Sequence, residues 1–180
     1  FHNSYYFHKD DNVITNKEEV CGDFEKLINL QLKEKHPKSW MRAFFNMGLI
    51  NYIEGSRRML PCQAGEMNFF VEPYGDIYPC NGLEKKYWKK SMGNIRETPN
   101  FKEIWEGEQA EQVRQMVRRC PKNCWMVGTA SPVMHKYIKY PLKWALKNKL
   151  RSLQGKTACL DKCWYNVGQD PSQGDLREVF

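Results

Sequence analysis

Apolar residues recur at a helical period over residues 15–35, where polar residues fill most of the positions between them. This pattern predicts an amphipathic helix that buries one face. Thr15 and Glu18 have the spacing of a capping box, in which two side chains satisfy amide groups at a helix start. We therefore expect the helix to begin at Thr15, with a buried face that contains Phe24, Ile28 and Leu32.

Three further segments have the pattern of helices. The first follows Pro37, includes Ile53 and is stopped by Gly55. The second opens at Thr98 and Pro99, a favourable pair for an N-cap and a first helical position, and the third covers residues 108–119. The helix from Thr15 and the helix after Pro37 are predicted to serve as scaffold, with aromatic residues that belong to the core.

The last helical region is predicted over residues 131–153, with Ser131 and Pro132 at its start. Pro141 lies inside this region and should kink or split it, because proline lacks an amide hydrogen. Basic residues recur every three or four positions and form one stripe, which suits a membrane surface or a partner helix but is more often a solvated face. The stripe consists of Lys136, Lys139, Lys143, Lys147 and Arg151.

A β-hairpin is predicted between residues 69 and 78. Residues 69–71 are β-prone, residues 73–76 have the composition of a turn, and residues 77–78 begin the returning strand. Gly75 suits a turn position with positive φ, which other residues adopt only at a steric cost. The hairpin is framed by Cys62 and Cys80, so we expect these two cysteines to lie near each other.

Length and composition indicate a globular chain of the α+β class, with helices and one small hairpin in 180 residues of which 41% are apolar. The sequence has no run of about 18 apolar residues, which would be needed for a spanning helix. It begins FHNSYYFHKDD, without a signal peptide or an initiator methionine, so we expect a fragment of a longer protein. Residues 1–14 read as a strand or extended segment.

The formal net charge of +7 would suit anionic partners in general, from nucleic acid to lipid headgroups. Nucleic acid is not expected, because aromatic residues do not interleave with lysine and arginine in any recognisable binding motif. The sequence also has no glycine-rich phosphate loop, no nucleophile elbow and no convincing pair of catalytic carboxylates. Hydrolase and kinase chemistry are therefore unsupported.

Cysteine is the residue type in this sequence that is most suited to a functional site. An odd number of cysteines without a secretory signal indicates a reducing, cytoplasmic compartment, where clustered cysteines usually bind metal. Four thiolates suit tetrahedral zinc or a [4Fe-4S] cluster, and the spacing disfavours zinc because no C-x2-C knuckle is present. The seven cysteines are Cys21, Cys62, Cys80, Cys120, Cys124, Cys159 and Cys163.

The region from Cys62 to Trp125 resembles the SPASM and twitch domains of radical SAM enzymes. Cys62 and Cys80, with Gly75 between them, match the C-x9-15-G-x4-C signature that opens those domains, and FFVEPYGDIYPC is similar to their hairpin. The later SMGNIRETPNFKEIWEGEQAEQVRQMVRRCPKNC resembles the stretch that leads to their closing cysteines. The resemblance implies an α+β domain organised around a cysteine-ligated cluster, preceded in the full protein by a partial (β/α) barrel.

The resemblance implies one auxiliary [4Fe-4S] cluster with Cys62, Cys80, Cys120 and Cys124 as ligands. Full SPASM domains have a C-x2-C-x5-C-x3-C block that this sequence lacks, although Cys159 and Cys163 are possible additional ligands. Basic residues beside the closing pair, namely Arg118, Arg119 and Lys122, are plausible tuners of the cluster potential or simply solvated charges.

The SAM-binding motif C-x3-C-x2-C is absent, because Val127 and Asn166 occupy the third position after the two candidate pairs. S-adenosyl-L-methionine would therefore be bound only by the full-length protein, and this chain alone should not be active as an oxidoreductase. The resemblance implies a peptide or small-molecule substrate, a reducing partner such as a ferredoxin or flavodoxin, and a cluster that serves electron transfer or substrate binding.

This interpretation divides the chain into four predicted segments. Residues 1–58 would be the end of the barrel with connecting helices, and residues 59–130 the SPASM/twitch-like domain. Residues 131–156 would form the basic amphipathic helix, and residues 157–180 a Cys-x3-Cys segment with a flexible tail. The alternatives are a non-catalytic zinc-binding module for nucleic acid or another anionic partner, and an adaptor that binds a membrane surface.

Overall fold

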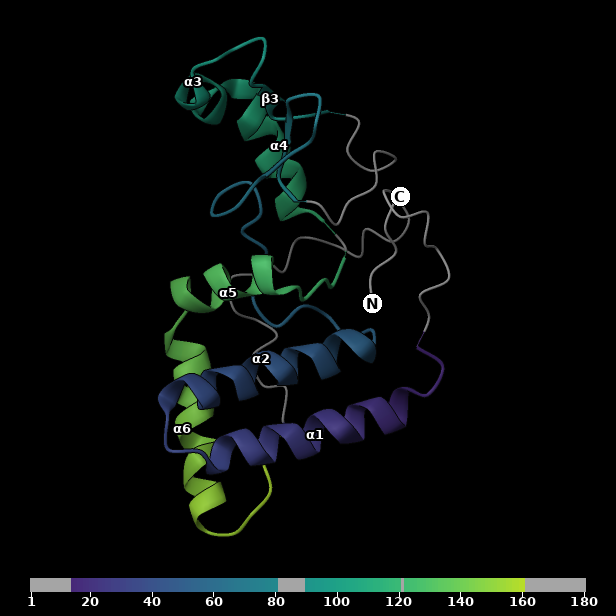
Figure 1. Ribbon diagram of the computed structural model, residues 1–180, viewed down its shortest axis with the longest axis vertical. Helices are drawn as coiled ribbons and strands as arrows, with labels where there is room; N and C mark the ends of the chain where they lie inside the picture. Colours follow the sequence, from purple (N-terminus) through teal and green to yellow (C-terminus); the bar gives the residue numbers. More distant parts are fainter. Residues whose placement is uncertain (1–13, 81–89, 121, 161–180) are drawn as a thin grey trace. The chain divides into compact units, whose positions relative to one another are not determined.

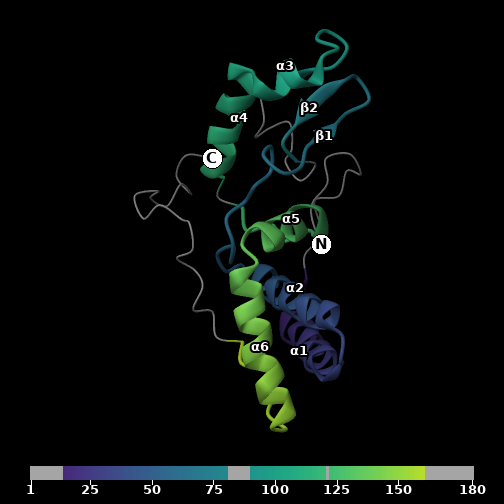
Figure 2. The same ribbon diagram turned by 90° about the vertical axis from the view of Figure 1, so that its left-hand side faces the viewer.

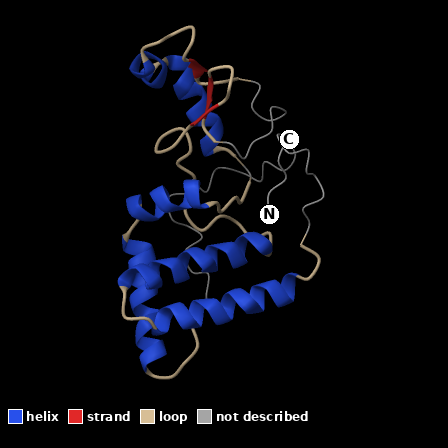
Figure 3. Cartoon of the chain, viewed as in Figure 1, coloured by secondary structure: helices blue, strands red, loops and turns tan. Residues whose placement is uncertain are grey.

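The computed structural model describes residues 14–80, 90–120 and 122–160. The chain divides into two compact units. We call residues 62–122 the hairpin unit, and residues 14–61 with 123–160 the helical unit. Together they confirm the α+β class, since helices predominate and one small antiparallel sheet is present (Figure 3). The expected strand at the N-terminus lies outside the described residues.

The helical unit consists of α1 (Lys17–Lys33), α2 (Pro37–Ile53), α5 (Val127–Lys136) and α6 (Lys139–Leu153). Helices α1 and α2 lie side by side, and α6 packs against both (Figures 1 and 2). Their facing sides enclose one hydrophobic core, in which burial of apolar surface is the main stabilising term. The largest side chains of this core include Ile28, Leu32, Phe44, Met47, Trp125 and Trp144.

The first helix confirms the predicted buried face, since Ile28 and Leu32 are fully buried and Phe24 packs against the same core. The predicted capping box is wrong. Asn16, not Thr15, is the N-cap, and its side-chain amide donates to the Glu19 carboxylate at 2.8 Å. The opposite end of α1 is closed by α6, because the Lys149 ammonium donates to the carbonyl oxygens of residues 32, 33 and 34.

The helical region predicted from Ser131, which was expected to be kinked or split at Pro141, is divided into two helices, and the division lies before Pro141. Helix α5 begins at Val127 and contains Pro132, and the break before α6 falls at residues 137–138. Pro141 lies in the first turn of α6, where an amide hydrogen would have no partner within the helix, so it costs no hydrogen bond there. The proline therefore marks the start of a helix and not a kink within one.

The hairpin unit contains a three-stranded antiparallel sheet with the order β1 (Phe70–Val71), β2 (Asp76–Tyr78) and β3 (Gly93–Asn94). Two helices follow, α3 (Phe101–Glu106) and α4 (Glu108–Arg118). The predicted hairpin is confirmed, with Phe70 opposite Tyr78. Strand β3 was not predicted, because two residues that include a glycine give no alternating pattern.

The N-cap of α3 is Asn100, whose side-chain oxygen accepts from the Lys102 amide at 3.2 Å. The predicted start at Thr98 and Pro99 is therefore two residues too early. Sheet and helices share a small second core, separate from that of the helical unit, whose buried members are Ala64, Ile77, Met92, Ile104, Ala110, Val113 and Val117.

No helix in the described part of the chain combines the length and the apolar composition that crossing a membrane would require.

Candidate metal centre

Cys62 and Cys80 lie at the two ends of the hairpin segment and pack against the same small core. Both are half-buried. A half-buried thiol beside an apolar core is shielded on one side and accessible on the other. Such a thiol can act as a ligand of a metal. Both cysteines thus pack against one core, and the predicted proximity of the two sulfurs to each other stays a prediction.

Asn68 joins the two cysteine-bearing segments. Its backbone carbonyl accepts from the Gly65 amide at 2.7 Å, which closes the loop after Cys62. Its side-chain amide donates to the carbonyl oxygen of Pro79 at 3.2 Å, immediately before Cys80. The other side-chain atom, Oδ1, is buried and accepts no hydrogen bond from the described residues. A buried acceptor without a hydrogen bond carries a desolvation cost of about 1–3 kcal/mol.

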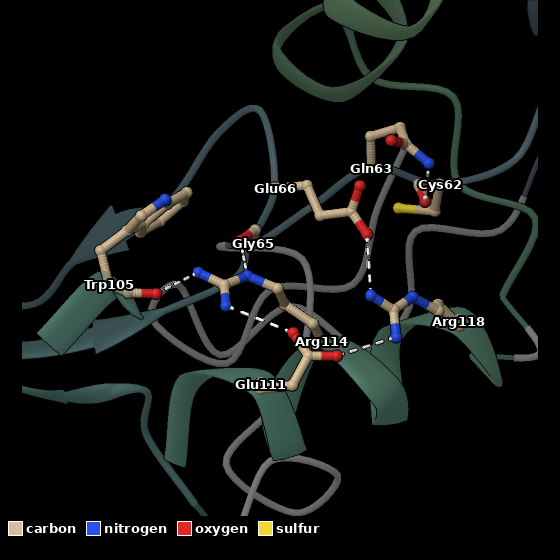
Figure 4. A network of polar contacts seen from close by, with 8 residues as sticks. All are labelled: Cys62, Gln63, Gly65, Glu66, Trp105, Glu111, Arg114 and Arg118. Atoms are coloured by element: carbon tan, nitrogen blue, oxygen red, sulfur yellow. Dashed lines mark hydrogen bonds and ion pairs between the residues drawn. The ribbon is translucent and has the colours of Figure 1, made fainter. Parts of the chain in front are cut away.

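Arg114 on α4 anchors the loop that follows Cys62 (Figure 4). Its Nε donates to the Gly65 carbonyl oxygen at 2.8 Å, and its Nη2 donates to the Trp105 carbonyl oxygen. The guanidinium also lies over the Trp105 ring, 4.8 Å from its centroid. Only 12% of the Arg114 side chain is exposed, so these charge-assisted bonds are shielded from water.

Arg118, one turn further along α4, bridges two carboxylates. Its guanidinium pairs with Glu111 at 3.0 Å and with Glu66 at 3.3 Å, as Figure 4 shows. The hydrogen bond from Arg118 lowers the pKa of the Glu111 carboxyl below its ordinary value, and Arg114 contributes in the same direction. Because its charge is compensated by these two carboxylates, Arg118 acts as a link between α4 and the Cys62 loop.

Cys120 lies near the C-terminal end of the hairpin unit. It follows the last turn of α4, and its amide donates to the Val117 carbonyl oxygen at 3.0 Å. The thiol is half-buried, as are those of Cys62 and Cys80. The C-terminal end of α4 thus holds the backbone of the third candidate ligand.

Cys124 belongs to the helical unit. Its carbonyl oxygen accepts a hydrogen bond from the buried Arg58, which also donates to the carbonyl oxygens of Leu60 and Thr129. The Arg58 guanidinium lies over the Trp125 ring at 5.3 Å from its centroid. Burial raises the pKa of the nearby Tyr52 hydroxyl, and the charge of Cys124 adds to the increase. The backbone of Cys124, the fourth candidate ligand, is therefore held by the buried guanidinium of Arg58.

Trp125 fixes the chain directly after Cys124. Its indole nitrogen donates to the Phe45 carbonyl oxygen at 2.8 Å. The ring lies so close to α2 that a Cβ added to Gly48 would stand 2.0 Å from the indole nitrogen. Only glycine permits this approach, so Gly48 and Trp125 are a matched pair.

The second cysteine pair is described only at Cys159. Its amide donates to the Asn148 side-chain oxygen at 2.6 Å, and its carbonyl oxygen accepts from Asn148 and from Trp144. Asn148 is fully buried on α6. Cys163 lies outside the described residues, so its role and that of Cys159 as ligands stay predictions.

Four cysteines of the predicted set are thus held on supported backbone, three in one unit and one in the other. Within the described ranges, no three side chains of histidine, cysteine, aspartate or glutamate come together as a group that could hold a metal ion. Cysteine sulfur is the donor type that suits a [4Fe-4S] cluster or zinc, and the shared ligation of one centre by these four cysteines stays a prediction.

Several supporting residues were not predicted from the sequence, namely Asn68, Arg58, Arg114 and Asn148. A single arginine or asparagine has no periodicity, and their roles depend on contacts between segments distant in the chain. The signal that finds them is burial of a polar side chain together with hydrogen bonds to backbone carbonyls.

Comparison with known protein families gives a match over the hairpin unit. Residues 62–126, a little over a third of the chain, match the family model named SPASM, described as an iron-sulfur cluster-binding domain. The match encloses Cys62, Cys80, Cys120 and Cys124 and leaves out the other three cysteines. Neither the curated proteins nor the solved structures contain a significant match. Residues 62–126 are therefore similar to the SPASM family of iron–sulfur cluster-binding domains.

Proposed function

We propose that this chain is the auxiliary cluster-binding part of a radical SAM enzyme that modifies a peptide or a small molecule. The observation that carries the proposal is the SPASM match, which begins at Cys62 and encloses all four candidate ligands. The α+β architecture with its cysteine-framed hairpin agrees with this assignment.

The proposed ligands of one [4Fe-4S] cluster are Cys62, Cys80, Cys120 and Cys124. When bound, such a cluster would supply one-electron transfer to or from the substrate, or a site for the substrate itself. Thiolate ligands are required for this, so the proposed site also favours a reducing, cytoplasmic environment.

The chain's own contribution is to hold these four thiols in place. Asn68 and Arg114 hold the backbone around Cys62 and Cys80, while Arg58 binds the carbonyl oxygen of Cys124. Groups that orient ligands from behind strongly influence the affinity and the electronic properties of a metal site. These three polar residues are therefore proposed as positioning residues of the centre.

S-adenosyl-L-methionine would be bound elsewhere in the full-length protein, because this sequence contains no C-x3-C-x2-C motif. We accordingly propose that the chain has no radical activity by itself. A ferredoxin or flavodoxin is the expected type of electron donor for the complete enzyme.

The test is iron and acid-labile sulfide content after anaerobic purification, together with the visible absorption spectrum. We expect about four iron and four sulfide per chain and a broad absorption near roughly 400 nm. Cys80→Ala should lower the iron content sharply, whereas Cys21→Ala should retain it, because Cys21 packs against the helical core outside the SPASM match. One zinc per chain without sulfide would overturn the proposal in favour of a zinc-binding module.

A further inference from the structure

Helix α6 has an exposed apolar face that the proposed cluster function does not use. Five large apolar side chains stand along it at intervals of four and three residues, and each is between 44% and 72% exposed. They form a continuous row, since residues four apart lie on the same side of a helix. We call this row the leucine ridge; it consists of Ile138, at the N-cap, Leu142, Leu146, Leu150 and Leu153.

A row of lysines runs beside the ridge. Lys139, Lys143 and Lys147 each directly follow a ridge residue in the sequence, and all three are exposed. The other members of the predicted basic stripe are placed differently. Lys136 lies at the end of α5, and Arg151 is half-buried and donates to the Thr157 carbonyl oxygen at 3.0 Å. The outward face of α6 therefore combines one apolar row with three lysines.

The opposite side of α6 is packed into the helical unit. Pro141, Trp144, Ala145 and Asn148 are buried there, and Lys149 binds the end of α1. The helix is thus anchored through one face and presents the other as a fixed surface about 22 Å long, at 1.5 Å per residue. Exposed leucines in such a row are unusual on a solvated helix, whose outer face is normally polar.

The charge of the surrounding sequence narrows the choice of partner. No aspartate or glutamate occurs between Glu111 and Asp161, so the 49 intervening residues carry only basic charges. A second copy of this chain would bring the same lysines face to face, which is unfavourable. An anionic partner is favoured by charge complementarity.

We propose that the outward face of α6 binds an anionic lipid surface. Leucine side chains would enter the boundary of the acyl chains, while the lysine ammonium groups extend on flexible stems to the phosphate headgroups. A lipid surface satisfies both rows at once and requires no matching groove. Binding in this manner is peripheral, with the helix lying along the surface of the membrane.

The experiment is cosedimentation of the full 180-residue chain with lipid vesicles. We expect binding to phosphatidylcholine vesicles that contain about one third phosphatidylglycerol, weak binding to pure phosphatidylcholine, and a decrease as salt is raised. The triple variant Lys139→Gln, Lys143→Gln, Lys147→Gln should lower the partition coefficient on the order of a hundredfold, because each lysine contributes roughly fivefold.

The apolar row is tested by the double variant Leu146→Gln, Leu150→Gln, which should lower partitioning by about tenfold. Leu30→Gln on α1 is the matched control, because Leu30 is 60% exposed and Leu150 is 61% exposed. Lys102→Gln on α3 controls for loss of a single exposed positive charge. Both controls should bind as the unaltered chain does, and circular dichroism should show that every variant retains its helices.

Failure of the chain to bind anionic vesicles, or unchanged binding by the lysine and leucine variants, would overturn the proposal. A concentration-dependent dimer that the leucine variant abolishes would assign the ridge to a second copy instead. Cys80→Ala should bind vesicles normally, so this test is independent of the proposed cluster.

Discussion

At the scale of single residues, buried and half-buried polar side chains hold the backbone near the candidate ligands. Arg58, Asn68 and Arg114 each donate to carbonyl oxygens of segments that are distant in the sequence. Hydrogen bonds from a charged donor are among the stronger ones in proteins, and leaving a buried carbonyl without its partner is costly. These residues therefore connect the stability of each unit to the placement of its cysteines.

Arg114→Met retains most of the side-chain volume and removes the bonds to Gly65 and Trp105. We expect this variant to lose about 3 kcal/mol of unfolding free energy, since bonds from charged groups contribute about 1.5–3 kcal/mol each. Urea denaturation of the anaerobically purified protein measures the loss, and the iron content should decrease with it.

Arg118→Met is the control for Arg114, because Arg118 lies one turn away on the same helix and its side chain is 48% exposed. Its ion pairs are solvated and should contribute about 1 kcal/mol or less. Equal losses of stability in the two variants would contradict the anchoring role of Arg114.

At the scale of elements, the turn between β1 and β2 depends on backbone conformation. Gly75 has φ of +94°, and its carbonyl oxygen accepts from the Ile95 amide at 2.9 Å, next to β3. A Cβ at this position would stand 2.8 Å from the Asn94 side-chain oxygen. Both the dihedral angle and the available space therefore require glycine at the point where the three strands meet.

Gly75→Ala should destabilise the hairpin unit by about 2 kcal/mol, because it combines an unfavourable positive φ with a close contact. Gly22→Ala is the matched control. Gly22 lies inside α1, and a Cβ added to it would meet no atom within 4 Å, so alanine there should stabilise by about 0.5–1 kcal/mol. Thermal unfolding of both variants gives the comparison, and a stabilised Gly75→Ala would contradict the steric argument.

At the scale of the whole molecule, the described residues form two cores with no buried residue in common. The helical unit contains the larger aromatic side chains, whereas the core of the hairpin unit consists of seven smaller buried residues. A core of that size supplies limited hydrophobic stabilisation, and small domains often rely on metal ligands for the remainder. We therefore expect the two units to respond differently to loss of a cluster.

Removal of iron with a chelator should increase amide hydrogen exchange in the hairpin unit, above all near Cys62, Cys80 and Cys120. Helices α1, α2 and α6 should remain protected, because their core contains none of these cysteines. Hydrogen exchange followed by mass spectrometry measures both units in one experiment. Equal loss of protection in the two units would show that they unfold together.

Much of the fold could be predicted from the sequence, because periodicity and turn composition are local properties. The buried face of α1, the ends of α2 at Pro37 and Gly55, and the pairing of β1 with β2 follow from residues close together in the chain. The errors lie at helix starts, where Asn16 and Asn100 compete with neighbouring residues that could also cap. Neighbouring polar residues have similar capping ability, so packing selects among them.

The sequence by itself determined the α+β class, the hairpin and the set of cysteines that resembles a SPASM domain, because these depend on residue types at short or fixed spacing. Only the tertiary structure showed that Arg58, Asn68 and Arg114 support the cysteine segments and that α6 exposes leucines beside its lysines. The physical reason is that burial and hydrogen-bond partners are determined by segments far apart in the chain, whereas spacing is a property of the chain alone.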